Sequence, residues 1–242
     1  MSGIWGKIIG GVGGFALGGP LGALVGAVAG HAVDRLRSDD GDNDQLRQTA
    51  FTVAVIALSA KMAKADGQVT RDEIDAFKEV FHVPPAEVKN VGRIFDMARK
   101  DASGFEPYAR QVGRMFASNP AVLEELLDAL FHIAKADKVM HPRELEFLRS
   151  VAEIFNFNEA EFERIRAGHL GADAADPYTV LGVDHNAEEA DIRAAWRKLI
   201  RENHPDSLIA QGMPQDFIDV ANDKMAAING AWDAVRRQRG FK

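Results

Sequence analysis

Apolar residues recur at helical spacing through most of the chain, and this periodicity constrains its fold more than any other feature. Val53, Ile56 and Ala60 lie three and four positions apart, and residues 123–131 repeat the pattern with leucines and a phenylalanine. Such spacing places apolar side chains on one face of a helix. No stretch shows the convincing alternation of apolar and polar residues that is typical of a strand. We therefore predict an all-α protein in which residues 49–168 form a compact helical bundle.

A short acidic motif occurs twice inside this predicted bundle. Ala-Lys-Ala-Asp occupies residues 63–66 and again residues 134–137, and each copy is followed by a glutamate, Glu73 or Glu144. Each copy predicts the end of one helix, a short turn and the start of the next helix, which in the second copy begins at His141-Pro142. The repeat resembles the TerB family of tellurite-resistance proteins, which are all-helical domains.

The resemblance to TerB also implies a divalent cation at the acidic turns. Its ligands would be Asp66, Glu73, Asp137 and Glu144. Hard cations prefer carboxylate oxygens as ligands. The alternative is that the same carboxylates bind backbone N–H groups at helix ends and interact favourably with the helix dipole, with no metal.

The N-terminal segment differs in composition from the rest of the chain. Residues 8–30 carry no charged side chain and are long enough to cross a bilayer as one helix. Glycine stands at every fourth position, which would let a second helix approach closely; these residues are Gly10, Gly14, Gly18, Gly22, Gly26 and Gly30. We predict a glycine-zipper membrane helix within residues 1–36 that forms a homodimer, followed by a polar linker at residues 37–48. A disordered glycine-rich tail and a cleavable signal peptide are the two alternatives.

The C-terminal residues 174–242 predict a short helix followed by an antiparallel helical hairpin. Asn186 is placed to cap the second helix, which carries Ile192 and Leu199 on its apolar face. The third helix begins near Pro214, and a joining loop contains His204-Pro205-Asp206. We expect these side chains of the third helix to pack against the second: Phe217, Val220, Met225, Ile228, Trp232 and Val235.

The tripeptide and its surroundings resemble the J-domain family. This resemblance implies a partner, a DnaK-type 70 kDa heat-shock chaperone whose ATP hydrolysis the J-domain promotes. The implied partner-binding residues are His204, Pro205, Asp206, Arg193, Arg197, Lys198 and Arg201. For the basic residues, an ordinary solvated helix face is the alternative.

The order of the three parts resembles the DjlA family of membrane-anchored co-chaperones. The resemblance implies a single span in the inner membrane, with the TerB-like domain and the J-domain in the cytoplasm. It also implies recruitment of the chaperone to the membrane. The rival interpretation is a membrane-associated, metal-responsive TerB-like adaptor whose J-like segment is a scaffold that does not stimulate the chaperone.

Composition and missing motifs exclude several other functions. The formal net charge of −7 gives no global basic field for nucleic acid, and the absence of cysteine excludes disulfides and Cys-ligated zinc. The chain has no P-loop, no G-x-G-x-x-G sequence and no G-x-S-x-G elbow. We therefore expect no enzymatic activity and no cofactor, apart from the cation that the TerB resemblance implies.

Overall fold

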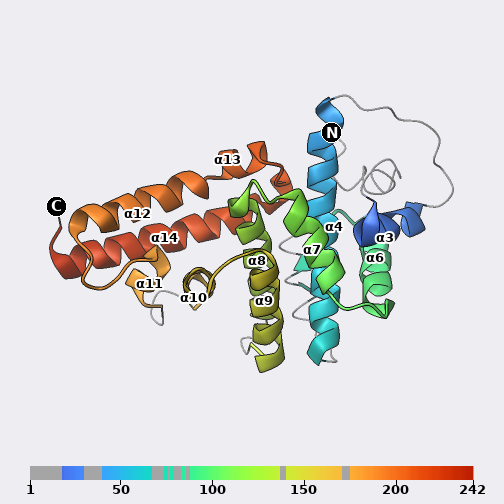
Figure 1. The fold of residues 1–242 in the computed structure, drawn as a ribbon, viewed down its shortest axis with the longest axis horizontal. Coiled ribbons are helices and arrows are strands. Elements are labelled where there is room, and N and C mark those ends of the chain that lie inside the picture. Colours follow the sequence, from blue (N-terminus) through green and yellow to red (C-terminus); the bar gives the residue numbers. More distant parts are fainter. Residues whose placement is uncertain are drawn as a thin grey trace.

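The computed structural model is an assembly of helices built around one long central helix (Figure 1). It describes residues 18–29, 40–66, 74–75, 77–78, 83–85, 88–136, 140–170 and 175–241, and none of these lies in a strand. The bundle helices are α3 (Gly19–Ala29), α4 (Asp40–Asp66), α6 (Val88–Lys100), α7 (Glu106–Met115), α8 (Pro120–Ala134), α9 (Pro142–Ile154) and α10 (Glu159–Gly168). The C-terminal elements are α11 (Pro177–Leu181), α12 (Glu189–Glu202), α13 (Pro205–Ala210), the 3-10 helix η1 (Gln215–Phe217) and α14 (Ile218–Arg239). The predicted all-α fold is confirmed.

Helix α4 is the centre of the bundle. Every side chain from residue 49 to residue 63 is buried, because α6, α7, α8 and α9 surround the helix. The one lysine in this stretch, Lys61, is satisfied by the loop after α6: its Nζ donates to the main-chain oxygen of Asp101 at 3.1 Å and to that of Ser103 at 2.6 Å. A helical stretch that is largely apolar all round is buried either in a protein core or in a membrane, and here the neighbouring helices cover it.

Proline marks helix starts in the bundle as the sequence predicted. Pro120 and Pro142 are the first residues of α8 and α9, where the missing N–H leaves no helical bond unmade. His141 is the N-cap of α9, and its side chain accepts a hydrogen bond from the N–H of Arg143. The second copy of the acidic motif is thus a helix end, a turn and a capped helix start.

The predicted linker at residues 37–48 is wrong over most of its length, since α4 begins at Asp40. Leu46 packs against the bundle core, and Thr49 onward is buried. Once the buried part of α4 has formed, each further residue adds a helical hydrogen bond at no new nucleation cost. The helix therefore extends into a polar sequence that has little apolar surface of its own.

The described part of the N-terminal segment is α3, which lies against α4, α6 and α7. Leu21 and Leu24 are buried in the bundle core, and Gln111 of α7 holds the start of the helix. The N–H of Leu21 donates to Gln111 Oε1 at 3.0 Å, and Gln111 Nε2 donates to the main-chain oxygen of Gly18 at 2.9 Å.

The prediction of one unbroken helix over residues 8–30 is wrong at Gly18 and Gly19. Both have φ of +56°, and a Cβ at Gly19 would lie 2.7 Å from Oε1 of Gln111. Glycine accepts this left-handed backbone at little cost, and Pro20 then suits the first helical turn. Within the described ranges, no helix combines the length and the apolar character needed to cross a membrane. Gly10, Gly14 and Gly30 of the predicted zipper lie outside the described residues.

The C-terminal hairpin forms as predicted, with α12 and α14 antiparallel and α11 packed against α14 (Figure 1). Their shared core contains Ile192, Ile228, Trp232 and Val235. The predicted cap at Asn186 is wrong, because the N-cap of α12 is Glu188. The N–H of Asn186 instead donates to Oδ1 of Asp184, two residues earlier, within the turn before α12.

The first part of α14 and the elements before it pack into the bundle and not into the hairpin. Phe217 and Val220, which we expected against α12, belong to the core that surrounds α4. The rings of Phe217 and Phe51 meet edge to face with centroids 4.7 Å apart, and Leu208 and Met213 are buried in the same core. The bundle and the C-terminal region therefore share one hydrophobic core at this end.

Candidate partner-binding site

The exposed side of α12 carries the basic residues that the sequence predicted. Ile192 and Leu199 are buried in the hairpin core, whereas Arg197, Lys198 and Arg201 are exposed. Within the described structure these three cations have no ion pair, so their charge faces solvent. The helix thus has one apolar face and one cationic face, as its periodicity predicts.

Arg193 differs from the other three basic residues. Its Nη2 lies 2.7 Å from Oε1 of Glu189, one helical turn earlier, and its guanidinium lies over the ring of Trp232 at 5.4 Å from the centroid. Trp232 also stacks on Trp196, with centroids 5.0 Å apart. Arg193 therefore stabilises the outer edge of the α12–α14 contact and has less freedom to meet a partner.

His204-Pro205-Asp206 starts a short helix and does not lie in an irregular loop as we predicted. His204 is the N-cap of α13, and its Nδ1 accepts a hydrogen bond from the N–H of Asp206 at 3.2 Å. Pro205 is buried at the first helical position, where its fixed φ suits the turn. The side chains of His204 and Asp206 are 52% and 89% exposed, so both present polar atoms to solvent. Because Nδ1 acts as an acceptor, the neutral ring carries its proton on Nε2.

Asn203 sets the direction of the tripeptide, and the sequence reasoning missed it. Its side chain is buried and its Nδ2 donates to the main-chain oxygen of Leu199 at 2.8 Å, which closes the last turn of α12. The signal was present in the sequence, because asparagine often occurs at helix ends, where its short amide bonds to the backbone.

Lys198 and Arg201 also line a cleft between α12 and the bundle. The cleft has a volume of about 660 Å³, and its other wall includes Asn158 and Glu161 at the start of α10. The four predicted basic residues therefore divide in space: Lys198 and Arg201 face the bundle side, Arg193 lies over the hairpin, and Arg197 is exposed. A partner that contacts all of α12 must also approach the bundle.

The candidate cation ligands of the bundle are only partly described. Glu144 is buried, and its Oε2 accepts a hydrogen bond from the N–H of His141 at 2.7 Å, completing a capping box. The side chains of Asp66, Glu73 and Asp137 lie outside the described residues. Among the side chains that are described, no group of three or more potential ligands is placed to hold a metal ion. The capping role that we gave as the alternative therefore applies to Glu144, and the cation site remains a prediction.

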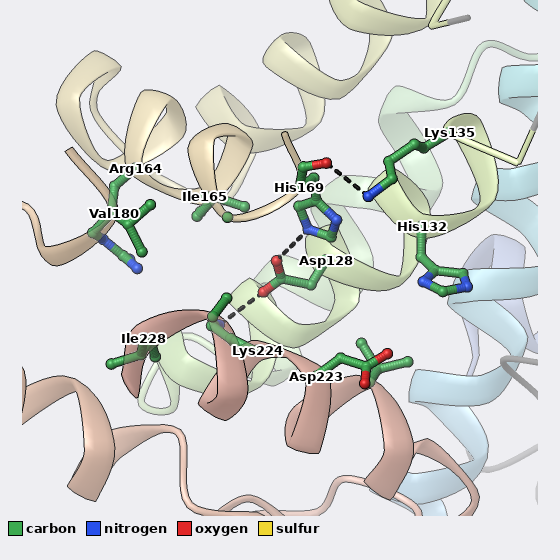
Figure 2. A pocket seen from close by; sticks show the side chains of 13 residues that line it. Asp128, His132, Lys135, Arg164, Ile165, His169, Val180, Asp223, Lys224 and Ile228 are labelled. Atoms are coloured by element: carbon green, nitrogen blue, oxygen red, sulfur yellow. Dashed lines mark hydrogen bonds and ion pairs between the residues drawn. The ribbon is translucent and has the colours of Figure 1, made fainter. Parts of the chain in front are cut away.

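A buried cluster of charges joins the bundle to α14, and the sequence reasoning missed it as well. Figure 2 shows Lys224 of α14 and His169, the C-cap of α10, both directed at Asp128 of α8. The carboxylates of α8 surround the lysine: Lys224 Nζ lies 2.6 Å from Glu124, 3.0 Å from Glu125 and 2.7 Å from Asp128. Acidic residues inside the apolar stretch 122–131 were the available signal, because a buried carboxylate needs a partner.

The pKa values of this cluster follow from burial and from the central lysine. Burial alone would lower the pKa of Lys224, but Asp128, Glu124 and Glu125 raise it well above its usual range. Burial would raise the pKa of Asp128, but Lys224 and His169 lower it to about 2. Lys224 is thus firmly charged, and it holds α14 against α8.

Comparisons with known proteins agree with the three predicted parts in their order. Residues 1–50 match the family model "Co-chaperone DjlA transmembrane domain", residues 52–167 match "Tellurite resistance protein TerB", and residues 176–239 match "DnaJ domain". No solved structure matches the chain.

Curated relatives match over nearly the full length. Co-chaperone protein DjlA of Photobacterium profundum is 30% identical over 277 residues, which covers 99% of this chain and 100% of the relative. The protein of the same name from Escherichia coli K12 is 25% identical over 268 residues, covering 98% and 99% of the two chains. That of Vibrio vulnificus is 28% identical over 237 residues, covering 84% and 83%.

Proposed function

Because the chain belongs to the DjlA family of co-chaperones, we propose that it stimulates ATP hydrolysis by a DnaK-type chaperone and recruits that chaperone to the membrane. The observation that carries this proposal is the exposed His204-Pro205-Asp206 at the start of α13, next to the cationic face of α12. DjlA proteins are a co-chaperone family and not an enzyme family. The chemical step, hydrolysis of ATP, therefore belongs to the partner.

The tripeptide supplies two kinds of contact to the partner. Asp206 presents a carboxylate that can pair with an arginine or lysine of the chaperone. His204 presents Nε2–H as a donor, while its Nδ1 keeps the backbone at the start of α13 in place. Pro205 is buried and fixes the turn. The rigid turn thus holds the two polar groups in one geometry before the partner arrives, which reduces the entropy lost on binding.

The cationic residues of α12 act over a longer range. Arg197, Lys198 and Arg201 attract an acidic surface of the chaperone and raise the rate of encounter, an effect that salt weakens. Charge reversal at Arg197 is the cleanest probe, because this side chain is exposed and has no ion pair among the described residues.

The decisive experiment is single-turnover ATP hydrolysis by a DnaK-type chaperone with the full-length protein in detergent micelles. Intact protein should accelerate hydrolysis, and His204→Gln should abolish the acceleration, with an unchanged circular dichroism spectrum. Arg197→Glu should retain part of the acceleration, and the acceleration should depend less on salt than with the parent protein, because Lys198 and Arg201 remain. No acceleration by intact protein with several cognate chaperones would refute the proposal and leave the adaptor function.

The family's transmembrane-domain model covers residues 1–50, which supports a membrane location for this chain. The proposed arrangement is attachment to the inner membrane through the N-terminal segment, with the bundle and the J-domain in the cytoplasm, where ATP is available. A single span that includes residues 18–29 requires α3 to leave its place against α4, α6 and α7. The proposed dimer forms through the glycines of the N-terminal segment. Protease protection of the chain in inside-out and right-side-out vesicles tests the orientation.

A further inference from the structure

The charge cluster between the bundle and α14 does not balance when every group has its ordinary charge. Three carboxylates of α8 face two cations, Arg164 of α10 and Lys224 of α14. Arg164 binds Glu124 through both terminal nitrogens, at 2.9 Å and 2.5 Å, so this pair is satisfied as a fork. Lys224 is then the one permanent cation that pairs with both Glu125 and Asp128, so the described cluster has one negative charge in excess.

This excess charge lies where water cannot offset it. The side chains of Glu125, Asp128 and Lys224 are 1%, 5% and 9% exposed. An ionised group in such a place costs several kcal/mol unless it is paired. A buried cluster with one surplus negative charge therefore favours the uptake of one proton.

Glu125 is the residue best placed to take that proton. Its Oε1 accepts from Lys224 at 3.0 Å, but its Oε2 is buried and has no hydrogen-bond partner in the described structure. Oδ2 of Asp128 likewise has no hydrogen-bond partner among the described residues, but it lies 2.7 Å from Lys224 Nζ. Because His169 Nε2 also lies 2.7 Å from Oδ1 of Asp128 (Figure 2), Asp128 is better supported in its charged form. Burial raises the pKa of Glu125 to about 7, the opposite of the direction found for Asp128.

We propose that Glu125 is a proton-binding residue that controls how firmly the J-domain is held on the TerB-like bundle near neutral pH. With Glu125 neutral, three carboxyl groups and two cations carry no net charge, and α14 stays docked. With Glu125 ionised, the surplus charge is relieved when α14 moves away and water enters. This control of docking by Glu125 does not depend on whether the chain stimulates a chaperone.

The other charged groups that line the neighbouring cavity do not compensate the surplus negative charge of the cluster. A cavity of about 170 Å³ beside Asp128 is lined by His132 and Lys135 of α8, by Arg164 and His169, and by Asp223 of α14. Lys135 donates to the main-chain oxygen of His169 at 2.7 Å, so its ammonium group is already bonded there. Asp223 is exposed to solvent. The cavity provides the route by which water reaches the cluster.

The sign of the pH effect follows from the two pKa values of Glu125. The carboxyl group releases its proton near pH 4.5 in the unfolded chain and near pH 7 in the folded protein. Between these values the folded protein holds a proton that the unfolded chain has lost, so raising the pH favours unfolding. One such proton raises the unfolding equilibrium constant about tenfold per pH unit within this window.

The test uses a pair of spin labels on the full-length protein, which has no natural cysteine to interfere. Arg110→Cys on α7 and Ala190→Cys on α12 place one label on the bundle and one on the J-domain, both at exposed positions. The distance distribution should be narrow at pH 6 and broad at pH 8. Glu125→Gln, which cannot ionise, should keep it narrow at both pH values, while the exposed control Glu153→Gln should behave like the parent protein.

Three results would overturn the proposal. A distribution with the same width at pH 6 and pH 8 in the parent protein would show that no proton controls docking. A pH response that survives in Glu125→Gln and disappears in His169→Asn would assign the proton to the histidine. Urea unfolding of the unsubstituted protein between pH 5 and pH 7 provides a measurement that needs no variant: stability that does not fall across this window also contradicts the proposal.

Discussion

Replacement of Lys224 by methionine tests the buried ion cluster that joins α14 to α8. The side chain is 9% exposed and lies within 3.0 Å of three carboxylates, so the substitution removes their common cation while keeping the length of the chain. Removing one partner of a buried ion pair typically costs about 3–5 kcal/mol. Glu124 keeps Arg164 and Asp128 keeps His169, so Glu125 loses most.

We expect Lys224→Met to lower the free energy of unfolding by about 3–5 kcal/mol at pH 6, where α14 is docked, measured by urea denaturation of the full-length protein in micelles. The loss should be smaller at pH 8, because ionisation of Glu125 already weakens the docking of α14 in the parent protein. Lys198→Met, an exposed control, should change stability by less than about 0.5 kcal/mol. A loss below about 1 kcal/mol, or one equal to that of the control, would refute the conclusion that this lysine holds α14 on α8.

Three further predictions address the shared core, the membrane segment and the cation site. Phe217→Ala should lower the free energy of unfolding by about 3–5 kcal/mol, because its fully buried ring contacts the core around α4. Calorimetry of the parent protein should show one unfolding transition for the bundle and the J-domain together, and two separate transitions would contradict a shared core. Gly10→Leu or Gly14→Leu should weaken crosslinking of the chain in membranes, and unchanged crosslinking would argue against the glycine interface. Calcium or magnesium should give binding heat and a thermal shift that Asp66→Asn with Asp137→Asn removes, whereas no heat with the parent protein would eliminate the cation site.

The features that were predicted correctly depend on short stretches of sequence. The starts of α8 and α9 are fixed by Pro120 and by His141-Pro142, and the all-α fold follows from periodicity within each helix. These features can be recognised without knowing which element packs against the helix. The order of the bundle and the hairpin was recognised from motifs that are equally local.

The predictions that failed required knowledge of the tertiary partner. The apolar face of α14 is continuous, but Phe217 packs on the bundle while Trp232 packs on α12. Periodicity shows which face is buried and not which element covers it. The backbone break at Gly18 and Gly19 depends likewise on Gln111, which is distant in sequence. The same holds for Lys224, since no local pattern identifies a lysine whose carboxylates lie on another helix.

The two contacts between the bundle and α14 specify different properties of the docked J-domain. The apolar contact around Phe217 resists separation, but burial of apolar surface has no direction and tolerates small rotations of the helix. Lys224 restricts such rotations, because its Nζ must lie within about 3 Å of the carboxylates of Glu124, Glu125 and Asp128 on α8. The ion cluster therefore fixes the rotation and register of α14, and with it the direction in which α12 and the exposed His204 and Asp206 face relative to the bundle.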